Sequence, residues 1–226
     1  ISTDYAEINK FLNSVRKLMI LDEIKNIEKN YTISSYKLKH KYEQAKYLNK
    51  INKDNIYRKS FIEICRDLII NNSKYLISLS EKQINIIKDY LKNQNIYKLD
   101  KQLNSYINSA IDWQKIEKEY TQASPSIVVI DNFLEENTLR ELRNFSLESE
   151  IWNYEYQNNN YLGSFAGQGN YSEIHHGIVC ELLEKMPILL NNRGFQQMWA
   201  FNYDSNRKKG LSTHADFANV NLNFWI

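Results

Sequence analysis

Glycine and proline are scarce in this sequence and absent from its first 124 residues. Its 226 residues contain six glycines and two prolines, and all eight follow that point. Inside a helix, glycine costs about 1 kcal/mol and proline about 3 kcal/mol, so their absence favours helices separated by polar turns. The sequence therefore predicts an all-α region over residues 1–120.

Cysteine, long apolar runs and an excess of one charge are lacking as well. Cys65 and Cys180 lie far apart without CxxC spacing, so neither a disulfide framework nor a cysteine-based zinc site is indicated. The apolar runs are much shorter than the roughly 20 residues that span a bilayer. A formal net charge of only +2 argues against a nucleic-acid binder. We expect a soluble cytoplasmic protein with no membrane or nucleic-acid partner.

Apolar residues recur at helical spacing in three segments of the first region, which predicts three buried helix faces. Ser80 with Gln83 predicts a capping box, and Asp112 predicts a helix start before Trp113. The apolar stripes are Phe11, Val15, Leu18 and Met19; Phe61, Ile64, Cys65, Leu68 and Ile69; and Ile84, Ile87 and Leu91.

A short polar connector, residues 121–126, is followed by a region of mixed character, residues 127–226. The change in patterning predicts an α+β fold class for the whole chain. The expected elements are a strand at 127–130, a helix that includes Leu139, Leu142 and Phe145, a loop at 152–171, a helix at 172–190 bent near Pro187, and a strand at 195–203.

One spacing predicts chemistry, the histidine and aspartate at positions 214 and 216. In an extended chain, residues i and i+2 point to the same side with Cα atoms about 7 Å apart, so both side chains can reach one metal ion. An imidazole and a carboxylate form two thirds of the 2-His-1-carboxylate triad of non-haem Fe(II) enzymes. By spacing alone, a solvated turn before a strand is the better interpretation of His214 and Asp216.

Several segments from residue 125 onward resemble a known family. They read SIVVIDNFL, NFSLESEIWN, YLGSF, MWAFNYDS and GLSTHADFANVNLNFWI. Together they look like a bacterial branch of the Fe(II)/2-oxoglutarate-dependent dioxygenases, related to prolyl-hydroxylase-like enzymes. Helical segments such as KLKHKYEQAKYL resemble what precedes this domain in such proteins. The resemblance implies a double-stranded β-helix, or jelly-roll, that begins at 127 and is incomplete at residue 226.

The resemblance also implies a site. His214 and Asp216 would be the first two ligands of Fe(II), with 2-oxoglutarate and dioxygen as cosubstrates. The third ligand, a histidine, and the basic residue that binds the far carboxylate of 2-oxoglutarate would follow residue 226. The reaction would hydroxylate an unknown substrate: a small molecule, a glycan or a protein side chain. With two ligands only, we expect no robust turnover from this chain itself.

Four further residues are candidates for binding the cosubstrate or substrate. In similar enzymes a tyrosine at the end of a strand hydrogen-bonds 2-oxoglutarate, and Tyr203 has this place; a packed strand aromatic fits it equally. Asn221, Asn223 and Trp225 alternate with apolar residues, which predicts a strand with a polar-aromatic face. That face would look into the cavity or, as in an ordinary strand, into solvent.

The remaining histidines predict structure rather than chemistry. His175 and His176 precede the His214 pair, against the family order, and are expected on a helix with one partly buried and one exposed. His40 is expected to be structural or at the surface. Two other functions stay open: a helical interaction or scaffold protein with a non-catalytic jelly-roll module, and a hydrolase that uses zinc at the same pair.

Overall fold

The computed structural model of the chain describes residues 5–51, 55–71, 74–156, 161–191, 193–203 and 216–226. They form two units, each assembled from separate stretches of chain. Unit 1 takes its residues from 1–97, 147–170 and 199–212, and unit 2 from 98–146, 171–198 and 213–226. Each unit contains residues that precede the connector at 121–126 and residues that follow it. The domain boundaries expected from the sequence stay a prediction.

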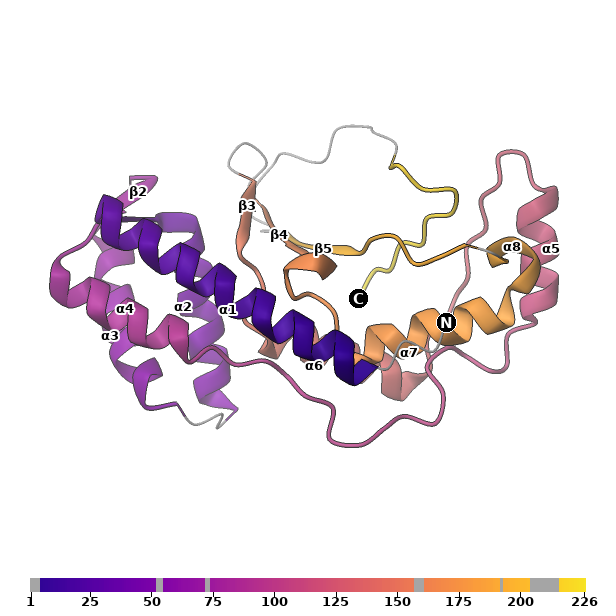
Figure 1. Cartoon of the computed structure of the whole chain (residues 1–226), viewed down its shortest axis with the longest axis horizontal. Coiled ribbons are helices and arrows are strands. Elements are labelled where there is room, and N and C mark those ends of the chain that lie inside the picture. Colours follow the sequence, from indigo (N-terminus) through magenta and orange to yellow (C-terminus); the bar gives the residue numbers. More distant parts are fainter. Residues whose placement is uncertain (1–4, 52–54, 72–73, 157–160, 192, 204–215) are drawn as a thin grey trace. The chain divides into compact units, whose positions relative to one another are not determined.

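Four helices and a small ribbon make up the first stretch of unit 1. Helix α2 packs on α3, α3 on α4, and α4 on α1 (Figure 1). Strands β1 and β2 pair antiparallel, with Ile33 opposite Ile77. The predicted helical region is thus present, with this ribbon as an addition. The bounds are α1 Tyr5–Asn30, β1 Thr32–Ser34, α2 Ser35–Lys50, α3 Ile56–Ile70, β2 Leu76–Ser78 and α4 Glu81–Lys92.

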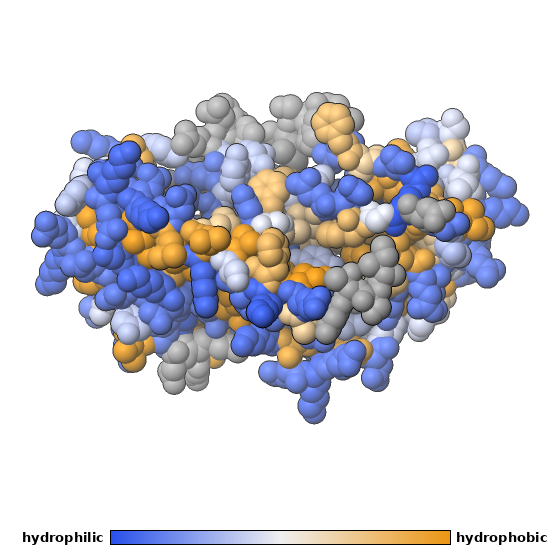
Figure 2. Space-filling model, viewed as in Figure 1, coloured by the Kyte–Doolittle hydropathy of each residue, from blue (hydrophilic) through white to orange (hydrophobic). Residues whose placement is uncertain are grey.

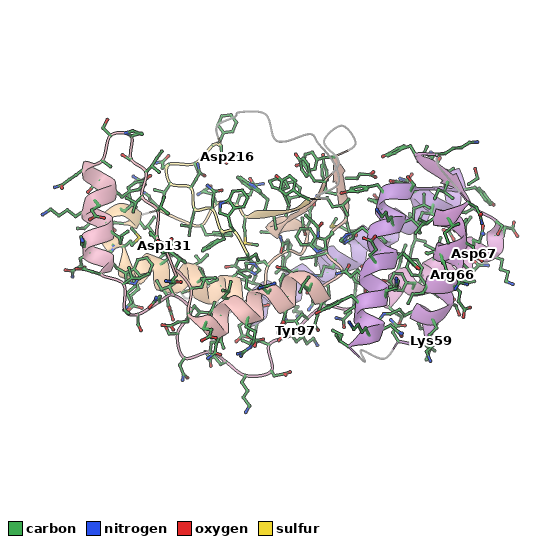
Figure 3. The ribbon with its side chains drawn as sticks, turned by 180° about the vertical axis from the view of Figure 1, so that it is seen from behind. Lys59, Arg66, Asp67, Tyr97, Asp131 and Asp216 are labelled. Atoms are coloured by element: carbon green, nitrogen blue, oxygen red, sulfur yellow. The ribbon has the colours of Figure 1, made fainter. Side chains whose placement is uncertain are left out.

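The core of this helical layer follows two of the three predicted stripes. On α3, Phe61, Cys65 and Leu68 are buried, and the ring of Phe61 stacks on that of Tyr90 with centroids 3.7 Å apart. The other side of α3 carries polar side chains (Figure 3). They are Lys59, Arg66 and Asp67. On α4, Ile84, Ile87 and Leu91 are buried as predicted.

The stripe predicted for α1 is wrong. Phe11 and Leu18 are 64% and 66% exposed, and the buried residues of the helix are Leu12, Ile24 and Ile27. Ile24 and Ile27 belong to the helical core, so the packing of the C-terminal part of α1 fixes which side of the helix is buried. Apolar atoms are accordingly visible along α1 on the surface (Figure 2).

Buried polar side chains tie the helices to the later stretch of unit 1. The Gln44 amide on α2 donates hydrogen bonds to the carbonyls of Leu147 and Ser149, at 3.0 and 2.9 Å. The Lys41 ammonium donates to Asn153 Oδ1 at 3.0 Å. Since Gln44 and Lys41 are both buried, residues 147–153 supply acceptors that these side chains need.

Both predicted helix starts are confirmed. The Ser80 N–H donates to Gln83 Oε1 at 2.8 Å and the Gln83 N–H to Ser80 Oγ at 3.4 Å, which is the capping box of α4. Asp112 Oδ1 accepts from the Lys115 N–H at 3.0 Å and begins α5, Trp113–Gln122.

A three-stranded antiparallel sheet completes unit 1. Its strands are β3 Tyr154–Tyr156, β4 Tyr161–Phe165 and β5 Trp199–Tyr203, in the order β3-β4-β5. The strand predicted at 195–203 is therefore confirmed for its last five residues. The loop predicted at 152–171 is wrong, because β3 and β4 pair with each other and a 3-10 turn, η1 Ala166–Gln168, follows them.

Unit 2 is built mainly on α5, α6 Glu136–Glu148, α7 Glu173–Lys185 and α8 Pro187–Leu190. The helix predicted at 172–190 is present, but near Pro187 it is broken rather than bent, since α7 ends at Lys185 and Pro187 opens α8. The strand predicted at 127–130 is wrong. Ile127 and Val129 are 68% and 83% exposed, and no described strand lies beside them to complete a ladder.

The α+β class is confirmed, and the described strands form one two-stranded and one three-stranded sheet. Among the residues with assigned positions, no helix combines the length and apolar character needed to cross a bilayer.

Candidate functional site

The predicted iron-binding pair is only partly within the described residues. His214 lies outside them, and Asp216 is the first residue of the last described stretch (Figure 3). Asp216 is half-buried, and its carbonyl accepts a hydrogen bond from the Ala218 N–H at 3.0 Å. The convergence of the two side chains therefore stays a prediction.

The strand expected around Asn221, Asn223 and Trp225 is not formed. Residues 216–226 are irregular, and the side chains of 221–226 are all exposed, with Trp225 at 93%. No described strand pairs with this stretch. Without a partner strand, the alternation of polar and apolar residues does not produce two faces of a sheet. The ring of Phe224 contacts the ring of Phe133, with centroids 5.0 Å apart.

Tyr203 has the position that the sequence predicts, as the last residue of β5. Its ring centroid lies 5.1 Å from that of Tyr161 on the neighbouring strand, and the side chain is 45% exposed. Partial burial raises the pKa of the Tyr203 phenol, and the nearby phenols of Tyr161 and Tyr156 raise it further. The hydroxyl therefore keeps its proton at neutral pH and can donate a hydrogen bond.

Tyr203 belongs to a larger feature, a sheet face made almost wholly of rings. Cross-strand partners share a face, and the register aligns Tyr156, Tyr161 and Tyr203 in one row. The next rows along the sheet share the same face because side chains alternate along a strand. This aromatic face consists of Tyr154, Tyr156, Tyr161, Phe165, Trp199, Phe201 and Tyr203, with Gly163 among them.

The rings of the aromatic face pack on one another around Tyr161, which is 3% exposed. Tyr156 stacks on Tyr161 with centroids 4.5 Å apart, and Phe201 meets Tyr161 edge-on at 5.1 Å. A Cβ on Gly163 would lie 2.9 Å from Tyr156 Cε2, so glycine makes room for the Tyr156 ring. The centre of the face is thus packed, and the rims at Tyr154 and Tyr203 are accessible.

The opposite face of the sheet is turned into unit 1. Leu162 and Ser164 are buried, and Ser164 Oγ donates to the Ile151 carbonyl at 2.8 Å. Glu155 Oε1 accepts from Ser34 Oγ, before helix α2, at 2.9 Å. The aromatic face is therefore the side of this sheet that is not turned toward the helices of unit 1. Its sequence signal is the alternation of rings in all three strands, which the expectation of a loop at 152–171 obscured.

His40 and His175 have structural surroundings, as expected, but the exposed member expected of the pair is not found, because His175 and His176 are both half-buried. Burial lowers the pKa of His40 to about 4 and that of His175 to about 4, so both imidazoles are neutral at physiological pH. His40 meets Trp152 edge-on, with centroids 6.5 Å apart. His175 Nδ1 lies 2.7 Å from Ser172 Oγ at the start of α7.

The described residues include one of the two proposed ligands, Asp216, and among them no three His, Cys, Asp or Glu side chains come together around one point. No protein-family model, curated protein or solved structure matches the chain.

Proposed function

We propose that this chain is part of an Fe(II)/2-oxoglutarate-dependent oxygenase with a jelly-roll domain. The observation that carries the proposal is the place of Tyr203. It ends a strand of an antiparallel sheet and precedes His214 by eleven residues, in the order that the resemblance implies. His214 and Asp216 would hold the metal, whose open coordination positions supply the site for 2-oxoglutarate and dioxygen.

The residues of this chain have three tasks in this proposal. The protonated Tyr203 hydroxyl donates a hydrogen bond to a carboxylate oxygen of the cosubstrate. The rings of the aromatic face hold the Tyr203 side chain at its accessible rim, with the centroid of Tyr161 5.1 Å away. His214 and Asp216 provide two ligands, and a third histidine has to come from a position that the resemblance does not assign within residues 1–226.

Anaerobic titration with Fe(II) and 2-oxoglutarate tests the metal pair. We expect weak binding by the wild-type chain, because two protein ligands give little affinity, and loss of that binding in His214→Ala and Asp216→Ala. Asp131→Ala is the matched control, since it removes an exposed carboxylate outside the proposed site. Equal binding by wild type, His214→Ala and Asp216→Ala would show that the pair is not a metal site.

Turnover provides a separate measurement. We expect succinate release by this chain to stay at the level of a protein-free blank, and robust release would contradict the two-ligand arrangement. Tyr203→Phe tests the hydrogen bond to the cosubstrate. It should reduce the gain in Fe(II) affinity that 2-oxoglutarate gives, and it should leave the affinity for Fe(II) alone unchanged.

The exposure of apolar side chains favours a second candidate, an interaction or scaffold module. Phe11 and Leu18 on α1 and Trp225 near residue 226 are all largely exposed. Exposed apolar side chains that lie together are typical of surfaces that bind another protein, and Phe11 and Leu18 are seven residues apart on one face of α1. A chain that shows no Fe(II) binding in the titration above would support this module over the oxygenase.

A further inference from the structure

Helix α1 has a second apolar side besides the one that it buries in unit 1. Phe11 and Leu18 are largely exposed, and Leu21, three residues further on, is 47% exposed. Because these side chains follow one another at intervals of seven and three residues, they lie on one side of the helix. The residues that α1 buries, among them Leu12 and Ile27, lie on the other side.

This apolar side is bounded by opposite charges at its two ends. The α1 stripe consists of six exposed residues that alternate at spacings of four and three positions: Glu7, Phe11, Ser14, Leu18, Leu21 and Lys25. Apolar side chains and one small serine form its middle, with a carboxylate before them and an ammonium after them. Alternating spacings of four and three are those by which two helices pack lengthwise against each other.

The end charges favour a second copy of the same helix in the antiparallel direction. When two copies of the stripe pack antiparallel, the first position of one faces the last position of the other. Glu7 of each copy would then face Lys25 of the other, which gives two pairs of opposite charge. A parallel pair would place Glu7 beside Glu7 and Lys25 beside Lys25, and like charges in contact disfavour association.

The sizes of the middle side chains fit the same direction. In the antiparallel pair Phe11 would face Leu21, and the small Ser14 would face Leu18, so a larger side chain meets a smaller one in each layer. A parallel pair would bring two serines together and leave a gap there. Lys17 would lie near its own copy, but its exposed side chain can turn into solvent, where salt screens like charges.

We propose that the chain forms a homodimer through antiparallel packing of two α1 stripes. The dimer is independent of iron binding, and it gives the exposed apolar side chains of α1 a defined partner. Because the contact is only one helix wide, we expect a weak and reversible association, with a dissociation constant on the order of micromolar.

Sedimentation velocity of the full chain over micromolar concentrations measures this association. We expect a monomer–dimer equilibrium in wild type and a monomer in Leu18→Glu and in Phe11→Glu, since each places two carboxylates inside the contact. Ile56→Glu is the matched control, because it makes the same kind of change at an 80% exposed position on α3, and it should dimerise like wild type. Far-UV circular dichroism checks that all three variants keep their helices. A monomeric wild type, a dimer that persists in both α1 variants, or an equal loss in Ile56→Glu would overturn the proposal.

Exchange of the end charges tests the direction of packing. Glu7→Lys and Lys25→Glu should each weaken the dimer roughly 10-fold, because each creates like-charged contacts at both ends. The double variant restores both pairs with their signs exchanged, so it should recover the wild-type affinity. In a parallel dimer each substitution replaces one like-charged pair with another and changes little. Unchanged affinity in the single variants, or no recovery in the double variant, would contradict the antiparallel contact, and neither result would affect the iron titration.

Discussion

The hydroxyl of Tyr90 donates a hydrogen bond to the carboxylate of Glu150, sixty residues further along the chain. The other carboxylate oxygen accepts from the backbone N–H of Asn95. Tyr90 is completely buried and Glu150 almost completely. A buried carboxylate thus fastens the stretch after α6 to the helices of unit 1, and it makes the stability of the unit sensitive to pH.

Replacing Glu150 with glutamine should reduce this sensitivity. Burial raises the pKa of Glu150 above its ordinary 4.5, although the bonds from Tyr90 and Asn95 oppose the rise. A carboxyl whose pKa is raised by folding stabilises the fold most below its unfolded pKa, and that contribution is lost as pH rises through the folded value. From about pH 4.5 upward, urea midpoints should therefore fall less in Glu150→Gln than in wild type.

The exposed Glu184→Gln is the matched control and should keep the wild-type pH profile. Parallel profiles for Glu150→Gln and wild type would show that the buried carboxylate does not set the pH dependence.

Replacing Lys41 with methionine should destabilise unit 1. Lys41 Nζ lies 3.7 Å from Glu23 Oε2, and both side chains are largely out of water. Loss of one partner leaves the other charge buried, so we expect the free energy of unfolding to fall by about 3 kcal/mol. Lys39→Met on the same helix is the control. Its pair with Glu43 spans 4.0 Å in solvent and should contribute less than about 1 kcal/mol. Equal losses in the two variants would contradict the prediction.

Lys41→Met should also change how the free energy of unfolding declines as the pH is lowered. Burial acts to raise the pKa of Glu23, but Lys41 and Lys37 outweigh it and hold that pKa below the ordinary 4.5. A lowered pKa stabilises the fold above the unfolded value, and the contribution is lost as pH falls. In Lys41→Met the decline should therefore begin at a higher pH, as urea titrations below about pH 6 would measure.

Gly177 in α7 should not tolerate alanine. A Cβ there would lie 2.2 Å from Cζ of the Tyr106 ring. Alanine would otherwise favour a helix by roughly 1 kcal/mol, so a net loss of 1–3 kcal/mol, of the order of other overpacked sites, would identify the clash. Gly167→Ala is the control, because nothing lies within 4 Å of its added methyl group. Chemical unfolding of both variants, and of Gly177→Ala with Tyr106→Leu as a rescue, measures the effect. A stabilised Gly177→Ala would contradict it.

The residues of the aromatic face should contribute unequally to the free energy of unfolding. Tyr161 is buried under Tyr156 and Phe201, so Tyr161→Ala should lower the free energy of unfolding by about 3 kcal/mol or more. Tyr203→Ala, at the accessible rim, should cost less than about 1 kcal/mol. Thermal or urea unfolding separates the two, and a larger loss for Tyr203→Ala would mean that the rim carries the packing.

The features predicted correctly from the sequence are those that neighbouring residues determine. The cap formed by Ser80 and Gln83, the start at Asp112 and the interruption near Pro187 each involve groups within four positions of one another. The stripe of α3 succeeds because its buried side chains repeat at helical spacing. On α1 the same reasoning fails for Phe11 and Leu18, since the partner helix decides which side is covered.

The features missed depend on partners far away in the chain. Ile127 and Val129 have the composition of a strand but no neighbouring strand to pair with among the described residues. The aromatic face requires the register between β4 and β5, more than thirty residues apart, which composition does not specify. Of the candidate site, the place of Tyr203 was predicted.

The acceptors that Gln44 and Lys41 require, at residues 147–153, have a consequence for synthesis. A ribosome releases the helices of unit 1 long before it makes the residues that complete them. Until about fifty further residues have emerged, the Gln44 and Lys41 side chains of the nascent helices therefore lack these acceptors and have to bind water instead. Unit 1 thus reaches its final form late in translation, and an early stop codon would yield helices without their finishing partner.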